Sequence, residues 1–265
     1  MSHPSPILVY HKVQDCLELG ITTTTIRQFR LQMSYLYQKG YRTLRVGEWF
    51  GFFKNGQFPQ KTLTITFDDG YESIYHNAFP VMEEYGFVST VFVVVGFVGR
   101  ENSWDANLCG RKFSHLTWKQ MEAMAKYGHS FQSHTVNHPD LCKLSPSQIR
   151  YELGHSRELL EDKMGMAVEF LACPFGRANS LTREMAKKIG YKAAFGQTPK
   201  GGDYSLNREG MYLIDNLWDF RQKLGQGRFL WGERLKGKFI NFFAQGTPLI
   251  KRLPDYKELG INDGE

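Results

Sequence analysis

The stretch Leu63-Thr64-Ile65-Thr66-Phe67-Asp68-Asp69-Gly70 decides the fold of this 265-residue chain. Its apolar, β-branched first part predicts a buried strand over Leu63–Phe67. The strand runs directly into two carboxylates, which repel each other unless a cation binds or one of them acts as a base. An Asp-Gly turn with Asp69 as a helix cap explains the same residues without chemistry. This motif alone leaves both interpretations open.

Outward from this strand, short apolar runs alternate with longer amphipathic segments. Further strands are expected at Ile7–Tyr10, Ser89–Val95, Ser130–Gln132, Val168–Ala172, Ala193–Phe195 and Met211–Ile214. Helices are expected at Thr25–Lys39, Ser73–Tyr85, Thr117–Lys126, Pro146–Met164 and Thr182–Lys188. This alternation predicts an α/β protein with a mainly parallel sheet or barrel. A long polar loop is expected over Gly96–Phe113, and loops of that length tend to be functional.

Composition narrows the class of protein. Hydrophobic residues make up 42% and charged residues 23% of the chain, values typical of globular proteins. The longest apolar run, Val91–Val95, is far shorter than the roughly 20 residues of a membrane span. The first residues lack the basic start and apolar core of a secretory signal, and the four cysteines are scattered. We therefore expect a cytoplasmic protein with unbridged thiols.

Two further motifs carry chemistry. His134 and His138 lie four residues apart in Ser133-His134-Thr135-Val136-Asn137-His138, a spacing that lets two imidazoles share one metal. The turn Ala172-Cys173-Pro174-Phe175-Gly176 could aim a backbone N–H at an oxyanion. Taken singly, a chance histidine pair and an ordinary turn explain them equally well. Two imidazoles joined to a carboxylate form the ligand set of a hydrolytic metal centre.

In this order, TFDDG, HTVNH and ACPFG resemble the polysaccharide deacetylase family, also called carbohydrate esterase family 4 or the NodB-homology domain. The resemblance extends from about residue 5 to residue 220. It implies an α/β fold, a distorted (β/α) barrel forming a single catalytic domain over residues 1–220. It also implies metal-dependent hydrolysis of the acetamide of an N-acetylated sugar or glycan precursor in cell-surface polysaccharide biosynthesis.

The same resemblance implies a role for each motif residue. Asp69, His134 and His138 would bind one divalent metal ion, with zinc expected and cobalt, nickel, manganese or iron also accepted by such a set. Asp68 would be the general base for the attacking water, and the backbone N–H of Phe175 would hold the oxyanion.

The sequence lacks two residues of the family pattern, and other residues must take over their roles. Ala172 stands where the family has an arginine, and no histidine follows His155 to serve as the late general acid. His11 ends the first expected strand in a Tyr-His segment that resembles the poly-N-acetylglucosamine deacetylase branch, so we expect it to be the acid. Arg208 is the expected substitute for the arginine. Alternatively, His11 is a structural histidine at a strand end, and Arg208 is an ordinary surface arginine.

Sugar contacts are expected from three further residues. Trp104 and Asp105, in an Asn-Ser-Trp-Asp stretch of the long loop, suit stacking on a sugar and acceptance from its hydroxyls. Trp218 is expected to line the acetyl pocket. Core packing is the alternative for both tryptophans.

Two other functions remain open: a cytoplasmic amide or imide hydrolase of the same fold, and a catalytically inactive carbohydrate-binding relative.

The net charge of +6 is concentrated near the C-terminus. Residues 221–257 hold nine Lys or Arg and two Asp or Glu, a local excess of +7, interleaved with aromatic residues. The first 220 residues are nearly neutral, so no nucleic-acid partner is expected. Residues 221–265 are expected to form a basic, aromatic, helical C-terminal extension. It would bring the protein to an anionic membrane surface or carrier lipid at the inner face of the membrane, unless it packs on the barrel.

Overall fold

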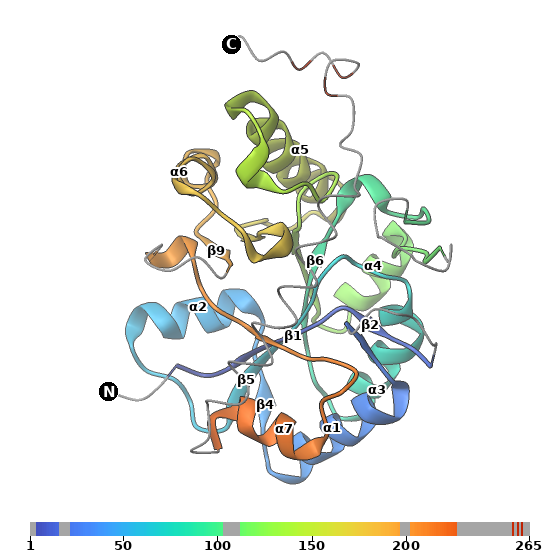
Figure 1. Ribbon diagram of the computed structural model, residues 1–265. Helices are drawn as coiled ribbons and strands as arrows, with labels where there is room; N and C mark the ends of the chain where they lie inside the picture. Colours follow the sequence, from blue (N-terminus) through green and yellow to red (C-terminus); the bar gives the residue numbers. More distant parts are fainter. Residues whose placement is uncertain are drawn as a thin grey trace.

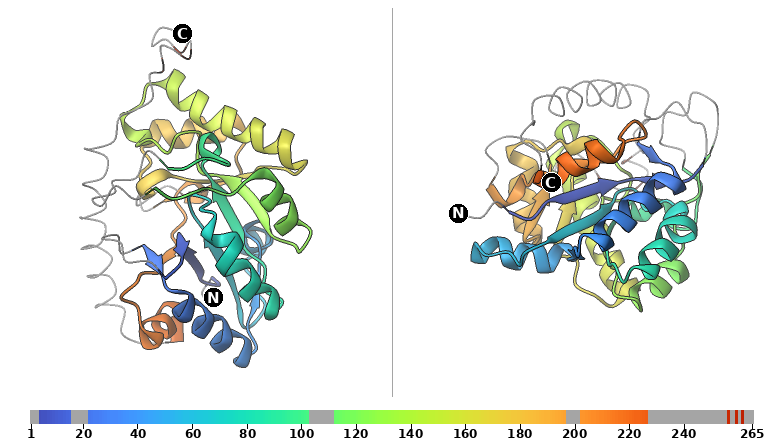
Figure 2. Two further views of the ribbon diagram at one scale, coloured as in Figure 1. Left: turned by 90° about the vertical axis from the view of Figure 1, so that its right-hand side faces the viewer. Right: turned by 90° about the horizontal axis from the view of Figure 1, so that it is seen from below.

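A curled sheet of parallel strands forms the centre of the protein, seen in a computed structural model (Figures 1 and 2). The structure describes residues 4–15, 22–102, 112–196 and 202–226, together with Tyr256, Leu259 and Ile261. The strand order is β10-β1-β5-β6-β7-β8-β9, and β4 pairs with β5 outside this path. The strands are β1 (Ile7–Tyr10), β4 (Arg42–Thr43), β5 (Thr62–Phe67), β6 (Thr90–Val93), β7 (Ser130–Ser133), β8 (Phe170–Ala172), β9 (Ala193–Phe195) and β10 (Glu209–Gly210). The predicted distorted (β/α) barrel is confirmed.

Helices cover the outer side of the sheet (Figures 1 and 2). They are α1 (Ile26–Gln38), α2 (Val46–Asn55), α3 (Phe79–Glu84), α4 (Trp118–Ala125), α5 (Pro146–Met164), α6 (Ser180–Ile189) and α7 (Leu217–Arg221). Short helical turns are η1 (Ile74–Ala78), η2 (Val95–Phe97), η3 (Leu141–Lys143), η4 (Pro174–Gly176), η5 (Gly202–Tyr204) and η6 (Gln222–Gln226). A second small sheet pairs β2 (Lys12–Val13) with β3 (Thr23–Thr24).

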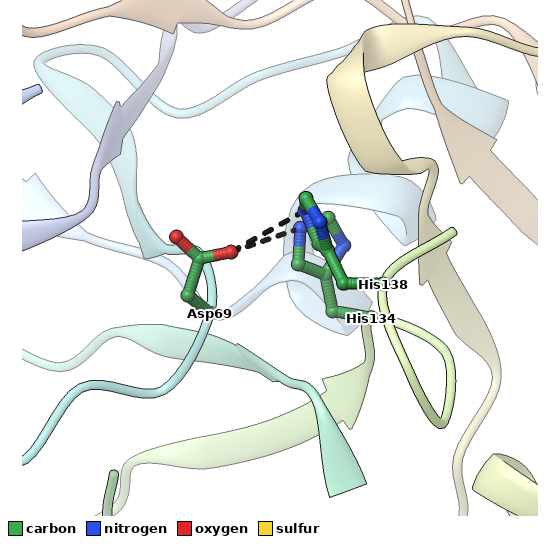
Figure 3. A group of neighbouring side chains, drawn as sticks. All are labelled: Asp69, His134 and His138. Carbon is green, nitrogen blue, oxygen red and sulfur yellow. Dashed lines mark ion pairs between the residues drawn. The ribbon is translucent and has the colours of Figure 1, made fainter. Parts of the chain in front are cut away.

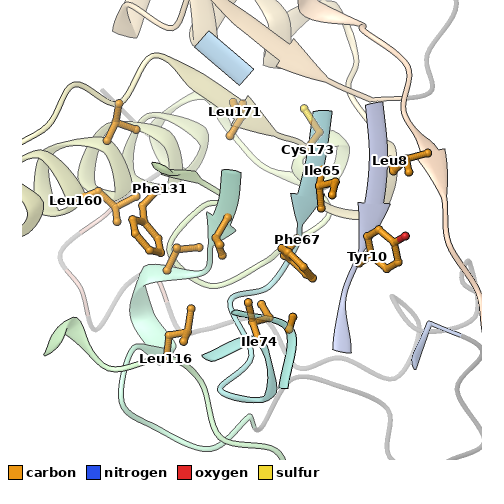
Figure 4. Close-up of a cluster of buried hydrophobic side chains, with 14 of the residues drawn as sticks. Leu8, Tyr10, Ile65, Phe67, Ile74, Leu116, Phe131, Leu160, Leu171 and Cys173 are labelled. Atoms are coloured by element: carbon orange, nitrogen blue, oxygen red, sulfur yellow. The ribbon is translucent and has the colours of Figure 1, made fainter. Parts of the chain in front are cut away.

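Buried apolar side chains fill the space between the sheet and the helices (Figure 4). Tyr10, Phe29 and Phe67 pack ring against ring, with centroids 5.2–6.0 Å apart. Such aromatic burial is worth several kcal/mol and fixes β1 and β5 against α1. None of the described helices is long and apolar enough to cross a membrane.

Several observed elements differ from the predicted ones. The expected helix Ser73–Tyr85 is helical from Ile74 to Glu84, but its first part, η1, is a π-helical turn that continues directly into α3, because Pro80 lacks the N–H of a regular α-helical bond. The expected strand Met211–Ile214 is a turn, closed by hydrogen bonds between Tyr212 and Asp215. Helix α2 was not predicted, since Gly47 and Gly51 weaken its helical pattern.

Regular secondary structure continues across residue 220, where the domain boundary was predicted. Helix α7 and turn η6 continue the described chain to Gln226. Most of the predicted C-terminal extension, residues 227–255, lies outside the described residues. Cys142 and Cys173 are unbridged, whereas Cys16 and Cys109 also lie outside the described residues.

Candidate metal centre

The carboxyl ends of β5 and β7 bring Asp69, His134 and His138 together (Figure 3). All three are at most 5% exposed, and one ligand atom from each lies within 4.8 Å of the other two. Asp69 Oδ1 is 3.4 Å from His134 Nε2 and 3.5 Å from His138 Nε2. These separations exceed an ordinary hydrogen bond and approach the about 3.3 Å between neighbouring ligands of a tetrahedral ion with bonds of about 2.0–2.1 Å. The donor set therefore fits a divalent metal ion.

Hydrogen bonding prepares His134 for this role. Its Nδ1 lies 2.7 Å from the carbonyl oxygen of Ala172, so Nδ1 carries the proton in the neutral ring and Nε2 faces Asp69 with its lone pair. Burial lowers the pKa of His134, but the negative charges of Asp68 and Asp69 outweigh burial and raise it. A proton and a cation thus compete for the same nitrogen.

Strained backbone marks all three motifs. Asp69, Thr135, His138 and Phe175 have positive φ angles of 70°, 72°, 55° and 57°. Each such conformation costs roughly 1–2 kcal/mol in a non-glycine residue. Lys61 is the remaining non-glycine residue with positive φ in the described part of the chain. Strain is therefore concentrated where side chains must converge.

Asp68, next to the ligand Asp69 in the chain, binds Arg208. The guanidinium contacts both carboxylate oxygens, at 2.7 and 2.6 Å, and donates to Thr66 Oγ1 at 3.2 Å. It also lies over the rings of Phe92 and Phe195, at 5.0 and 5.5 Å. Burial alone would raise the pKa of Asp68, but the nearby positive charges, Arg208 foremost, bring it below its usual value. Asp68 is thus an ionised, buried carboxylate.

Arg208 lies where the substitute for the family arginine was expected. It immediately precedes β10, whose neighbour β1 pairs in turn with β5, the strand that leads to Asp68. Ala172, which stands at the family position, is fully buried in β8. Arg208 reaches Asp68 from the segment that leads from Leu206, which pairs with Phe195 of β9, to β10. Its role as the substitute for the family arginine stays a prediction.

His11 lies beside Asp68. Tyr10 pairs with Phe67 across β1 and β5, and Asp68 N donates to the Tyr10 carbonyl at 2.9 Å, so the next residues of both strands are neighbours. The charge of His11 also contributes to the lowered pKa of Asp68. Its buried Nδ1 has no hydrogen-bond partner among the described residues.

The third motif forms the turn η4 at the other side of the ligands. The Phe175 ring lies 4.8 Å from the His138 ring, edge to face. Gly176 N and Arg177 N donate to the carbonyls of Cys173 and Pro174, which closes the turn around Phe175. The backbone of Phe175 is thereby fixed next to a metal ligand.

Of the three predicted sugar-contact residues, the structure describes Trp218. Trp218 lies on α7 with 56% of its surface exposed, and α7 packs on α1 through an edge-to-face contact between Phe220 and Tyr35. Trp104 and Asp105 lie outside the described residues. The roles of all three residues stay predictions.

Two supporting contacts escaped the sequence reading. Arg177 Nη1 lies 2.9 Å from Asp140 Oδ2, an ion pair that joins the second and third motifs. Glu152, fully buried on α5, accepts hydrogen bonds from the turn between the two histidines. A pattern could have revealed Glu152, because it shares the spacing of the apolar face formed by Ile149, Leu153 and Leu160.

Comparisons with known proteins agree with this geometry. The sequence profile of the family described as Polysaccharide deacetylase matches residues 55–194. YxkH of Bacillus subtilis, whose name places it in the same family, is 32% identical over 213 residues, covering 80% of this chain and 70% of the relative. A poly-beta-1,6-N-acetyl-D-glucosamine N-deacetylase of Staphylococcus aureus is 29% identical over 195 residues, which cover 68% of this chain and 65% of the relative.

Solved structures share the fold. The Streptococcus pyogenes deacetylase PplD, in complex with acetate, superposes with a TM-score of 0.74 at 27% identity, covering 83% of this chain and 97% of that one. IcaB from Ammonifex degensii superposes with a TM-score of 0.68 at 24% identity, covering 83% and 95%. The barrel and its buried His-His-Asp cluster define the class as a (β/α)-barrel hydrolase. More narrowly, the chain belongs to the polysaccharide deacetylase family.

Proposed function

We propose that the protein is a metal-dependent N-deacetylase that hydrolyses the acetamide of an N-acetylated sugar in a glycan or glycan precursor. The observation that carries this proposal is the convergence of Asp69, His134 and His138 beside the ionised Asp68–Arg208 pair. The name of the S. aureus relative supports the reaction type and an acetylated polysaccharide as the substrate class, and the S. pyogenes structure, described as a deacetylase with acetate, supports the reaction type. A role in cell-surface polysaccharide biosynthesis is part of the same proposal.

Asp69, His134 and His138 would hold the ion. When bound, a divalent ion supplies Lewis-acid chemistry: it polarises an amide carbonyl and makes water more acidic. Two imidazoles and one carboxylate accept zinc as well as cobalt, nickel, manganese or iron, and we propose zinc.

The remaining steps belong to side chains and backbone of this chain. Asp68, kept ionised by Arg208, accepts the proton of the attacking water. The N–H of Phe175 donates to the oxyanion of the tetrahedral intermediate. His11, which lies beside Asp68, protonates the departing amine, which leaves as the free amino sugar while the acyl group leaves as acetate.

Acetate release tests this proposal directly. Purified protein loaded with zinc should release acetate from N-acetylglucosamine oligomers, and Asp68→Asn should slow the reaction by roughly 10²–10⁴ while retaining zinc. Asp162→Asn is the matched control, because its side chain is 72% exposed on α5. His134→Ala should lose the metal.

The two alternatives give different results in the same assay. An amide or imide hydrolase would cleave cyclic imides and leave acetylated glycans intact. A carbohydrate-binding relative would bind the oligomers and release no acetate with any of the five metals. Either result would refute the deacetylase proposal.

We further propose that residues 221–257 bind an anionic membrane surface or carrier lipid. Their excess charge of +7 supports this, since each basic residue near anionic lipid contributes about 1 kcal/mol. The full-length protein should sediment with vesicles containing anionic lipid at low salt and be released at high salt. Absence of binding at low salt would contradict the proposal.

A further inference from the structure

A buried carboxylate supports the turn that carries both histidine ligands. Glu152 is fully buried on α5, the long helix labelled in Figure 1. Its Oε2 accepts from the backbone N–H groups of Val136 and Asn137, each at 2.9 Å, and its Oε1 accepts from Asn137 Nδ2 at 2.9 Å. Both oxygens therefore bind the segment between His134 and His138.

This turn depends on such support because its backbone is strained. Thr135 and His138 both have positive φ, and Thr135 Oγ1 accepts from His138 N at 2.9 Å. On the opposite side, Gly96 N donates to the Val136 carbonyl at 2.9 Å, and a Cβ at Gly96 would lie only 2.7 Å from that oxygen. Hydrogen bonds to a charged acceptor are stronger than those between neutral groups, so the bonds to Glu152 oppose this strain.

The fourth donor to Glu152 comes from near the end of the chain. The Tyr256 hydroxyl donates to Glu152 Oε1 at 2.8 Å, and Tyr256 is 5% exposed. Its ring packs edge to face against Tyr151, with centroids 6.4 Å apart. Burial, followed by the charge of Glu152, raises the pKa of Tyr256 far above its usual value, so the hydroxyl keeps its proton.

Neighbouring residues hold Tyr256 in place. Ile261 N donates to the Tyr256 carbonyl at 2.9 Å; Tyr256 belongs to the main core cluster, and the partly buried Ile261 packs against that cluster. Leu259 lines a groove whose wall includes Val136 and Asn137. The described C-terminal residues are thus seated directly behind the histidine turn.

We propose that Tyr256 is a positioning residue for the metal centre, acting through Glu152 on the spacing of His134 and His138. The inference rests on the proposed metal site. A carboxylate with four donors has one orientation, and removal of one donor lets it rotate away from the backbone N–H groups. Partners behind metal ligands commonly change metal affinity 10–100-fold when mutated.

The test compares Tyr256→Phe, Glu152→Gln and the double variant in the full-length protein. Zinc affinity of the folded apo-protein is measured by competition with a chromophoric chelator. We expect Tyr256→Phe to bind zinc about 10-fold more weakly, and Glu152→Gln up to about 100-fold more weakly. Because Tyr256 acts through Glu152, Tyr256→Phe should have no further effect in the Glu152→Gln background. Amide hydrogen exchange at Val136 and Asn137 should accelerate in apo Tyr256→Phe.

Tyr151→Phe is the matched control. Tyr151 lies on α5, the helix that carries Glu152, and its ring contacts Tyr256. Removing its hydroxyl should leave zinc affinity unchanged. If Glu152→Gln does not fold, Tyr256→Phe carries the test alone, since it deletes one oxygen and keeps the packed ring.

Two results would overturn the inference in distinguishable ways. Wild-type zinc affinity in Tyr256→Phe, even with lowered stability, would mean that the tyrosine has only a structural role, and the proposed function would stand. Failure of the wild-type protein to bind zinc or the other four metals would refute the metal centre itself, and the positioning role with it.

Discussion

Two adjacent carboxylates have opposite surroundings in this site. Asp69 faces two imidazoles, whereas Asp68 faces a guanidinium. The positive φ of Asp69 turns the chain between them, so that their side chains diverge. Asp69 does not cap the following helical turn, whose N-cap residue is Ser73. The two adjacent carboxylates therefore have separate partners, two imidazoles for Asp69 and a guanidinium for Asp68.

Arg208 should control the pH dependence of the reaction. In Arg208→Met, burial of Asp68 is no longer opposed by its main positive partner, so the pKa of Asp68 should rise. A base must be ionised to accept a proton, so the acidic limb of the kcat/KM profile should move to higher pH. Arg208→Lys keeps the charge without the two-pronged contact and should shift the profile less.

The measurement is a pH–rate profile of acetate release. Arg45→Met serves as control, because Arg45 is a half-exposed arginine that pairs with Glu48 rather than with a residue of the site. An unchanged acidic limb in Arg208→Met would show that another group sets the ionisation of the base.

His11→Ala should lower kcat by roughly 10²–10⁴, the usual contribution of a positioned general acid. No histidine follows His155 in the chain, so no late histidine can take over the role of His11. The control is His76→Ala, whose side chain is 60% exposed and pairs with Glu72. Single-turnover acetate release with saturating substrate separates the chemical step from binding. Full kcat in His11→Ala, with collapse in another histidine variant, would place the acid elsewhere.

At the scale of elements, local sequence patterns predicted the bounds of those helices and strands that local interactions determine. Helix α5 has the predicted bounds, because Ser145 caps it and Gly165 ends it in a left-handed conformation. Strand β1 also has its predicted bounds. By contrast, the segment after Gly210 has a strand-like sequence but turns, since Asp215 binds Tyr212 N and pairs with the buried Lys223. That pairing is tertiary, and no local pattern reports it.

His129, just before β7, should make the protein sensitive to acid. Its Nδ1 accepts from Ser89 N at 3.2 Å, and burial lowers its pKa from 6.5 to about 4. Between these values the unfolded chain binds the proton and the folded one does not. Stability should therefore fall by about 3 kcal/mol as the pH drops from 6.5 to 4.

Urea unfolding at several pH values measures this contribution. In His129→Gln, the part of the pH dependence due to His129 should vanish, while the exposed His155→Gln should retain the wild-type slope. Equal slopes in His129→Gln and wild type would mean that His129 is already protonated in the folded state.

At the scale of the whole molecule, the sequence identified residue types better than their partners. The three ligands could be predicted because each stands in a motif that follows an apolar strand. Arg208 could only be suggested, since it meets Asp68, 140 residues away, through the order β10-β1-β5 of the sheet. The link from Tyr256 to Glu152 spans 104 residues and left no local pattern at Tyr256. Such long-range contacts depend on the topology of the fold, which cannot be read directly from a single sequence.

Metal binding should stabilise the entire fold. Asp69 and His134 are 65 residues apart and follow β5 and β7, which are separated in the sheet by β6. A ligand that binds only the folded state adds RT ln(1 + [L]/Kd), about 2.7 kcal/mol at 100 times Kd. Chelation should therefore lower the unfolding temperature by several degrees. His138→Ala should abolish this difference, and His155→Ala, exposed on α5, should preserve it. Identical melting curves with zinc and with chelator would contradict a metal ion held by both strands.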